Sequence, residues 1–135
     1  MTARAEVLRQ AETRAGGRCE YCRMHQALQG ATFHLEHIVP SSHSGPTELN
    51  NLAWACPGCN LHKSNRTQAT DPETGAVVLL FNPRSESWSA HFEFQGYRLV
   101  GRTPVGRATE RLLDLNHPRR LLIRQAEELF HLFPP

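Results

Sequence analysis

Residues 19–22 read CEYC, residues 56–59 read CPGC, and the segment FHLEHIVP lies between them at residues 33–40. Each Cys-x-x-Cys pair places two thiols on one side of a tight turn, and two such turns supply the four sulfur ligands of a closed tetrahedral zinc site. The alternative is a set of unrelated buried or redox-active thiols, which the second pair disfavours. We therefore predict one structural zinc ion. Its four predicted ligands are Cys19, Cys22, Cys56 and Cys59.

The composition is that of a single small domain spanning residues 1–135. Hydrophobic residues make up 39% of the chain, which is below the usual share, so a metal that staples the fold is expected to help. The formal net charge of +2 permits nucleic-acid binding without arguing for it. We expect the arginines of the last third to lie on a solvated surface. They are Arg98, Arg102, Arg107, Arg111, Arg119, Arg120 and Arg124.

No apolar run approaches the ~20 residues that span a bilayer, so no membrane partner is expected. The first 17 residues are polar and lack the apolar centre of a secretory signal. Four cysteines in a reducing compartment are more typical of metal ligands than of disulfides. These features together predict a cytoplasmic protein.

The elements expected in the first half alternate between helix and strand. A helix over residues 3–15 is ended by Gly16 and Gly17, and a β-rich segment over 31–39 is ended by Pro40. After a turn-rich loop at 41–51, a short strand is expected over 49–54. A helix should then start between Pro57 and Asn60 and run to about residue 66. The order is strand, loop, strand and helix.

The second half is predicted to support this unit. A turn is expected at 71–75, a strand at 77–81, and a hairpin of strands 91–94 and 97–100 around Gln95-Gly96. Thr103 followed by Pro104 is typical of a helix start, and a last helix should begin before Pro118 and end near residue 130. The fold class is therefore α+β.

The motif Glu36-His37-Ile38-Val39-Pro40, followed by Asn51-Leu52 and by Cys59-Asn60 with Lys63, resembles the signature of the HNH endonuclease family. Fourteen residues separate His37 from Asn51, and nine separate Asn51 from Asn60. A looser likeness continues to about residue 108. The resemblance implies a ββα-metal core at about 19–67, stapled by the four-cysteine zinc. It also implies a flanking N-terminal helix, a small hairpin and C-terminal helices, with 76–135 as a supporting extension.

The resemblance implies a metal-dependent endonuclease that hydrolyses phosphodiester bonds of nucleic acid, with DNA as the expected substrate. A histidine changes protonation near neutral pH, so His37 suits a general base that activates water. Glu36 and Asn60 offer a carboxylate and an amide oxygen, which suit Mg²⁺ or Mn²⁺ stabilising the phosphate and the leaving group. By the same resemblance, Asn51 bonds backbone groups across the loop and holds His37 in place. Asn50 is the adjacent alternative.

Other residues near the motif carry weaker expectations. Lys63 and Arg66 follow Asn60 by three and six residues and are candidates to contact phosphate. Glu36 and His37 are neighbours on a strand and should point to opposite faces, so a bend is needed for both to reach one phosphate. We expect His34 to be a half-buried strand residue rather than a metal ligand.

Two other functions remain open. A zinc-dependent module that binds nucleic acid without cleaving it would keep the fold and the cysteines, but it would not need a base at His37. A structural zinc protein that binds another protein leaves the Glu36-His37 and Cys59-Asn60 pairs unexplained. The sequence does not decide between DNA and RNA, or between a monomer and a homodimer.

Overall fold

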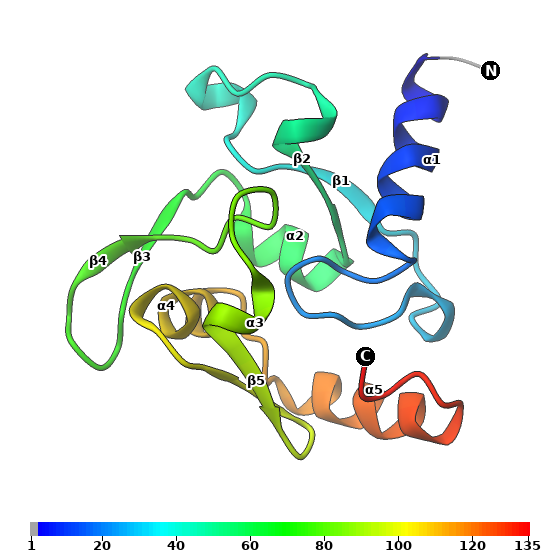
Figure 1. The fold of residues 1–135 in the computed structure, drawn as a ribbon, viewed down its shortest axis with the longest axis vertical. Coiled ribbons are helices and arrows are strands. Elements are labelled where there is room, and N and C mark those ends of the chain that lie inside the picture. Colours follow the sequence, from blue (N-terminus) through cyan, green and yellow to red (C-terminus); the bar gives the residue numbers. More distant parts are fainter. Residues whose placement is uncertain (1–2) are drawn as a thin grey trace.

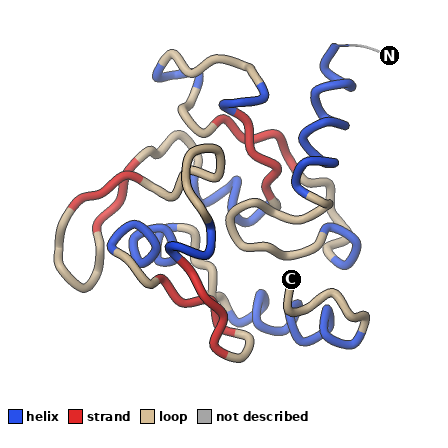
Figure 2. The backbone as a smooth tube through the Cα atoms, in the orientation of Figure 1, coloured by secondary structure: helices blue, strands red, loops and turns tan. Residues whose placement is uncertain are grey.

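The computed structural model describes residues 3–135 and has a mixed α+β architecture. Its strands form three separate antiparallel hairpins, with helices packed around them (Figure 1; Figure 2). The first hairpin pairs β1 (His34–His37) with β2 (Leu52–Ala55), the second pairs β3 (Gln68–Thr70) with β4 (Val77–Leu79), and the third pairs β5 (Phe92–Gln95) with β6 (Arg98–Gly101). The α+β prediction is confirmed.

The N-terminal helix α1 (Ala3–Ala15) ends where the sequence predicts. Gly16 and Gly17 both have positive φ values, +64° and +72°, which glycine adopts without steric cost. The helix packs against β2, and its last turn is joined to that strand by Arg14, which donates hydrogen bonds to the carbonyl oxygens of Leu49 and Leu52. The N-terminal helix α1 therefore helps to fix the position of the first hairpin.

The strand–loop–strand–helix order is confirmed, with shorter elements than expected. Residues Leu49–Asn51 form a 3-10 turn, so β2 starts at Leu52. Helix α2 (Pro57–Lys63) ends before residue 66 because Ser64 has a φ of +51° and breaks the helical path. The loop between the strands contains a second 3-10 turn, Ser41–His43. A third one, Gln26–Leu28, follows the first cysteine pair.

The C-terminal half contains α3 (Trp88–His91), the third hairpin, α4 (Pro104–Leu112) and α5 (Pro118–Leu129). The predicted Thr103 cap is present, since the Thr103 hydroxyl accepts from the N–H of Gly106. The last helix begins at Pro118, and the ring nitrogen of His117 accepts from the N–H of Arg119. Strand β6 and the start of α4 cross closely. A Cβ on Gly101, the last residue of β6, would lie 2.4 Å from the backbone nitrogen of Arg107 in α4, so only glycine fits there.

Three details of this half differ from the prediction. Strand β3 and helix α3 were not expected, because residues 68–70 are polar and residues 88–91 form only one turn. The third hairpin turns at Gly96-Tyr97, one residue later than expected, because Gly96 takes the positive φ of +61°. The strand at 77–81 ends at Leu79.

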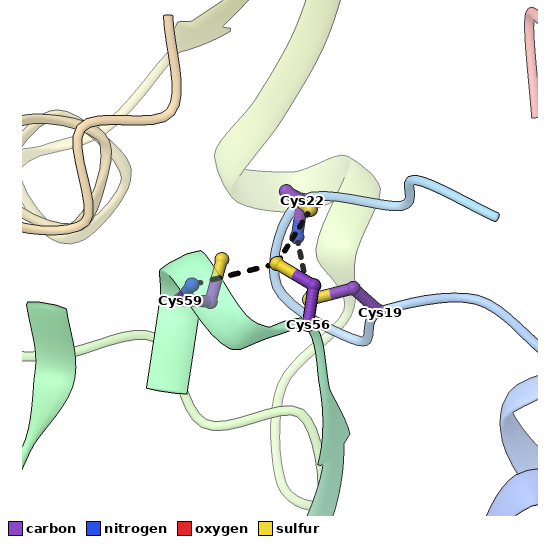
Figure 3. Close-up of side chains that lie close together, drawn as sticks. All are labelled: Cys19, Cys22, Cys56 and Cys59. Carbon is purple, nitrogen blue, oxygen red and sulfur yellow. Dashed lines mark hydrogen bonds between the residues drawn. The ribbon is translucent and has the colours of Figure 1, made fainter. Parts of the chain in front are cut away.

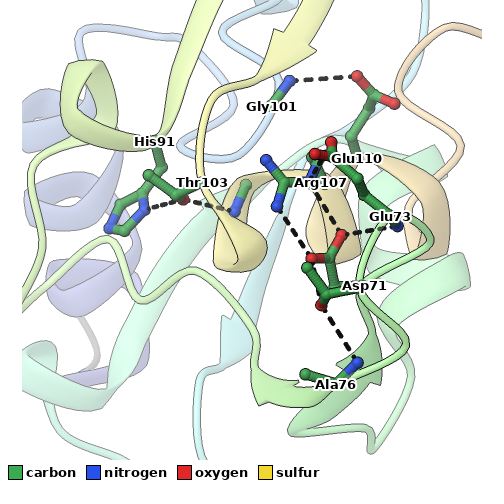
Figure 4. A network of polar contacts seen from close by, with 10 residues as sticks. Asp71, Glu73, Ala76, His91, Gly101, Thr103, Arg107 and Glu110 are labelled. Atoms are coloured by element: carbon green, nitrogen blue, oxygen red, sulfur yellow. Dashed lines mark hydrogen bonds and ion pairs between the residues drawn. The ribbon is translucent and has the colours of Figure 1, made fainter.

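Asp71 joins the second hairpin to α4 (Figure 4). Its buried carboxylate accepts two hydrogen bonds from Arg107, from Nε and from Nη2, at 2.9 Å each. The Arg107 guanidinium holds the pKa of Asp71 well below its usual range. The turn at 71–75 is therefore anchored to the helix by a two-pronged ion pair.

The buried residues form one cluster that runs from Ala11 in α1 to Leu115 after α4 and includes the four cysteines. Tyr21 and Phe92 each pack edge-on against Phe81, so aromatic contacts join the first cysteine pair to the third hairpin. A single domain over residues 1–135 stays a prediction. Within residues 3–135, no helix is both long enough and apolar enough to cross a membrane.

Candidate active site and metal centre

The two cysteine pairs meet in one buried cluster, formed by the loop before β1 and the start of α2 (Figure 3). The four Sγ atoms lie within 4.8 Å of one another, and each cysteine is at most 1% exposed. The N–H groups of Cys22 and Cys59 point at the sulfurs of Cys19 and Cys56, at 3.5 and 3.4 Å. This compact set of four sulfurs is consistent with a structural zinc site.

Burial raises the pKa of the Cys19 and Cys59 thiols, because a thiolate is poorly solvated inside the protein. A bound divalent cation offsets this cost by stabilising the thiolates directly. Donor type, number and spacing therefore all fit zinc.

Arg120 in α5 contributes a cation beside the sulfurs. Its Nη1 donates to the Sγ of Cys59 at 3.2 Å, and the residue is 7% exposed. Burial lowers the pKa of Arg120, but the Cys59 and Cys22 thiolates raise it more, so the net shift is upward. A Cβ on Gly58 would lie 2.5 Å from Nη2 of Arg120. The absence of a side chain at Gly58, inside the second cysteine pair, therefore leaves room for this guanidinium. The prediction of a solvated surface position is wrong for Arg120, and it is also wrong for Arg124, which is fully buried.

The register of the first hairpin directs the side chain of Glu36 into the protein interior. It lies opposite Ala53, and its side chain is 3% exposed. The Tyr21 hydroxyl donates to Oε2 at 2.7 Å, and Lys63 Nζ donates to Oε1 at 2.5 Å. Burial raises the pKa of Glu36, and the contacts with Lys63 and Tyr21 oppose the rise.

Lys63, the last residue of α2, is 1% exposed. Besides Glu36, its Nζ donates to the backbone carbonyl oxygens of His37 and Ile38, at 3.1 Å each. The three donors of an ammonium group thus meet three oxygens. The structure places this group in the interior and not on the surface, so a contact between Lys63 and phosphate would require the ammonium to move.

His37 is the last residue of β1 and is half-buried. The strand register is regular up to its pairing with Leu52, so His37 and Glu36 face opposite sides of the strand, and any bend lies beyond His37. The ring Nε2 lies 2.9 Å from the hydroxyl oxygen of Thr47, which belongs to the loop between the strands. The ring of His37 is thus both oriented by a hydrogen bond and accessible to solvent.

Asn51 fastens the segment that follows His37. Its Oδ1 accepts from the N–H of Val39 at 2.9 Å, and its Nδ2 donates to the carbonyl oxygens of Val39 and Pro46 at 3.0 and 2.8 Å. Its own carbonyl accepts from the N–H of Ile38. These are the backbone bonds across the loop that the resemblance implies. Asn50, the alternative, is exposed.

Replacing Asn51 with alanine is expected to lower the free energy of unfolding by about 1–3 kcal/mol, because it leaves the N–H of Val39 and two carbonyls without partners. Urea unfolding followed by circular dichroism measures the loss. Asn50→Ala is the matched control, since that side chain is exposed, and it should leave the midpoint unchanged. Equal effects of the two substitutions would contradict the assignment to Asn51.

Asn60 lies in the middle of α2, one turn before Lys63, so the two residues share a side of the helix. Among residues 3–135, no group is hydrogen-bonded to the Asn60 side chain, and its amide remains free to bind a ligand. Arg66 follows the helix and is exposed. His34 is exposed rather than half-buried as expected.

Three residues that contact this region had no signal in the sequence. Tyr21 lies inside the first cysteine pair, Thr47 lies in the long loop, and Arg120 comes from α5. Their partners are 15, 10 and 61 residues away along the chain. Only the folded backbone brings them together, and no local pattern marks them.

Comparison with known proteins assigns a family to this region. A protein-family model described as HNH endonuclease matches residues 19–66. No curated protein and no solved structure matches the chain. The matched segment begins at the first cysteine and ends after α2, so it includes the four-cysteine cluster, the first hairpin and the helix. Residues 19–66 of this chain are therefore an HNH endonuclease domain.

Proposed function

We propose that the protein is a metal-dependent endonuclease that hydrolyses phosphodiester bonds in DNA, with His37 as the general base. The family assignment implies a nucleic-acid substrate. The observation that carries the proposal is the placement of His37, which is accessible at the end of β1 while its surroundings are fixed. A general base needs that combination of access and orientation.

The hydrogen bond with Thr47 orients the ring of His37. We assign the Nε2 hydrogen to this bond, so that Nε2 donates to the Thr47 hydroxyl and Nδ1 is left without a proton. Nδ1 then accepts the proton of the attacking water. Asn51 keeps the backbone after His37 in one position, so the imidazole does not drift away from the phosphate.

Glu36 and His37 face opposite sides of β1, so one phosphate would meet both only at the end of the strand, where His37 is the last residue. The donor set around Glu36 fits a hard divalent cation. An ammonium already lies among the oxygens of Glu36, His37 and Ile38, and this supports a cation site with oxygen donors at this position. Glu36 and Asn60 would hold Mg²⁺ or Mn²⁺, with water completing the coordination. When bound, such an ion supplies charge stabilisation for the phosphate and the leaving oxygen.

Zinc and nucleic acid would use other residues. The four cysteines would hold zinc in a closed site, which has no position for substrate and so serves the fold. Arg66, exposed just beyond α2, is the proposed contact to backbone phosphate.

The test is a cleavage assay with zinc-loaded protein on supercoiled plasmid, single-stranded DNA and RNA, with Mg²⁺ or Mn²⁺ and with EDTA. We expect cleavage of DNA that requires the added metal and stops with EDTA. Protein that holds about one zinc per chain but cleaves none of the substrates would contradict the proposal. That result would favour the non-catalytic nucleic-acid-binding module, which a gel-shift assay on the same substrates would reveal.

A further inference from the structure

Lys63 is the only lysine in the sequence, whereas the chain contains fourteen arginines. It lies at the proposed metal site, where its Nζ is 2.5 Å from Oε1 of Glu36 and 3.1 Å from two backbone carbonyl oxygens. The side chains of Lys63 and Glu36 are 2% and 3% exposed. The single ammonium among the cationic side chains thus lies where three oxygens surround a compact cation, a geometry that a point charge fits better than a planar guanidinium does.

The ammonium and a divalent cation have the same requirement at this position. Both would bind Glu36 most directly at Oε1, because the Tyr21 hydroxyl already occupies one lone pair of Oε2. Two positive charges a few ångströms apart in the interior repel strongly. A buried carboxylate without any cation would also be costly, so the metal-free protein needs Lys63 where it is. The two cations therefore exclude each other at Glu36.

The surroundings give the displaced ammonium a place to go. Lys63 lines a cavity of about 570 Å³ between the end of β1 and the residues after β4. The walls of this cavity include Asn82, Ser85 and Glu86. Asn82 Oδ1 already accepts from the N–H of Arg84. The Glu86 carboxylate accepts from the N–H of Asn82 and pairs with His91, but each of these oxygens keeps a second lone pair for an ammonium group. An ammonium displaced from Glu36 would enter this cavity by rotation of the Lys63 side chain. Tyr21 keeps its bond to Oε2, so Glu36 stays in position during the exchange.

We propose that Lys63 is a resident counter-ion of Glu36 that a divalent metal ion must displace, so that metal binding and release of the Lys63 ammonium are one coupled event. This inference rests on the proposed metal site at Glu36 and Asn60. It implies that Lys63 lowers the affinity for metal, and that the amine becomes accessible only when metal is bound.

The single lysine makes the exchange measurable without any substrate. Zinc-loaded wild-type protein is treated with an amine-reactive acylating reagent, with and without saturating Mn²⁺ at matched ionic strength, and labelling of Lys63 is measured by mass spectrometry. The N-terminal amine of the expressed protein is the internal reference. We expect Mn²⁺ to increase the labelling rate of Lys63 by about tenfold or more, because the ammonium leaves its buried ion pair. Unchanged labelling at saturating Mn²⁺ would overturn the proposal.

Mn²⁺ titration followed by electron paramagnetic resonance tests the competition itself. Lys63→Met keeps the stem and removes the charge, and it is expected to bind Mn²⁺ about tenfold more tightly than wild type. Equal or weaker binding by a folded Lys63→Met protein would overturn the exchange. Glu36→Gln should bind Mn²⁺ at least about tenfold more weakly. If Glu36→Gln binds as well as wild type, the proposed metal site fails, and the exchange fails with it. The labelling experiment on wild type still decides the exchange if Lys63→Met does not fold.

Discussion

Replacing His37 with alanine is expected to lower the DNA cleavage rate by about 10²–10⁴-fold, the usual contribution of a general base. The substitution should leave the fold intact, because His37 is half-buried and, among residues 3–135, its ring bonds only the Thr47 hydroxyl of a surface loop. The measurement is the single-turnover rate on supercoiled plasmid at saturating protein and metal. Thermal unfolding by circular dichroism shows whether the variant is folded.

The matched control is His34→Ala. His34 lies on the same strand, three residues earlier, and is exposed. Its removal should change the rate by less than about twofold, since an exposed side chain far from the reacting water provides no proton transfer. Equal rates for wild type and His37→Ala would eliminate His37 as the base. A comparable loss in both variants would point to a general effect on the strand.

Removing the metal from the four-cysteine cluster is expected to have the largest effect on stability. Zinc bound by four thiolates contributes on the order of 10 kcal/mol to folding, which is as much as the whole stability of a typical domain. Here the sulfurs hold the start of α2 and the loop that contains Tyr21, and both are packed in the common core. A strong chelator at neutral pH should therefore abolish the cooperative thermal transition.

The experiment compares thermal unfolding before chelation, after chelation and after zinc is returned, with metal analysis at each stage. Cys59→Ser should behave like the chelated protein, because a hydroxyl is a much weaker zinc ligand than a thiolate. Recovery of the transition on adding zinc separates loss of the metal from irreversible damage. A metal-free protein that melts at the original temperature would show that the cluster does not need zinc.

Features that depend on short stretches of sequence were predictable. The cysteine pairs, the Gly16-Gly17 helix end and the Thr103 cap each follow from a few neighbouring residues. The bonds of Asn51 followed from the family resemblance, because the spacing from His37 fixes the loop that Asn51 must close. In each of these cases, local geometry determines the outcome.

Features that depend on distant segments were not predictable. Glu36 and Lys63 are 27 residues apart, and no rule of spacing indicates that the end of α2 returns to β1 with its ammonium on the carboxylate. Arg124 reads as one of several surface arginines, but the folded chain buries it among the carbonyl oxygens of Leu115 and Tyr97. A charged residue type predicts an exposed side chain only when the folded interior offers it no hydrogen-bond or ion-pair partner.

The position of α5 has a consequence for dissecting this protein. The helix and the residues after it reach the first cysteine loop at two points, where Glu127 accepts from the N–H of His25 and Arg18 donates to the carbonyl of Leu132. Together with the hydrogen bond from Arg120 to Cys59, these contacts place α5 and the residues after it beside the four-cysteine cluster. A fragment cut after residue 66 would keep every family motif and still expose its thiolates to water, oxidants and competing chelators. We therefore expect the smallest stable unit of this protein to be longer than the segment that matches the HNH endonuclease family model.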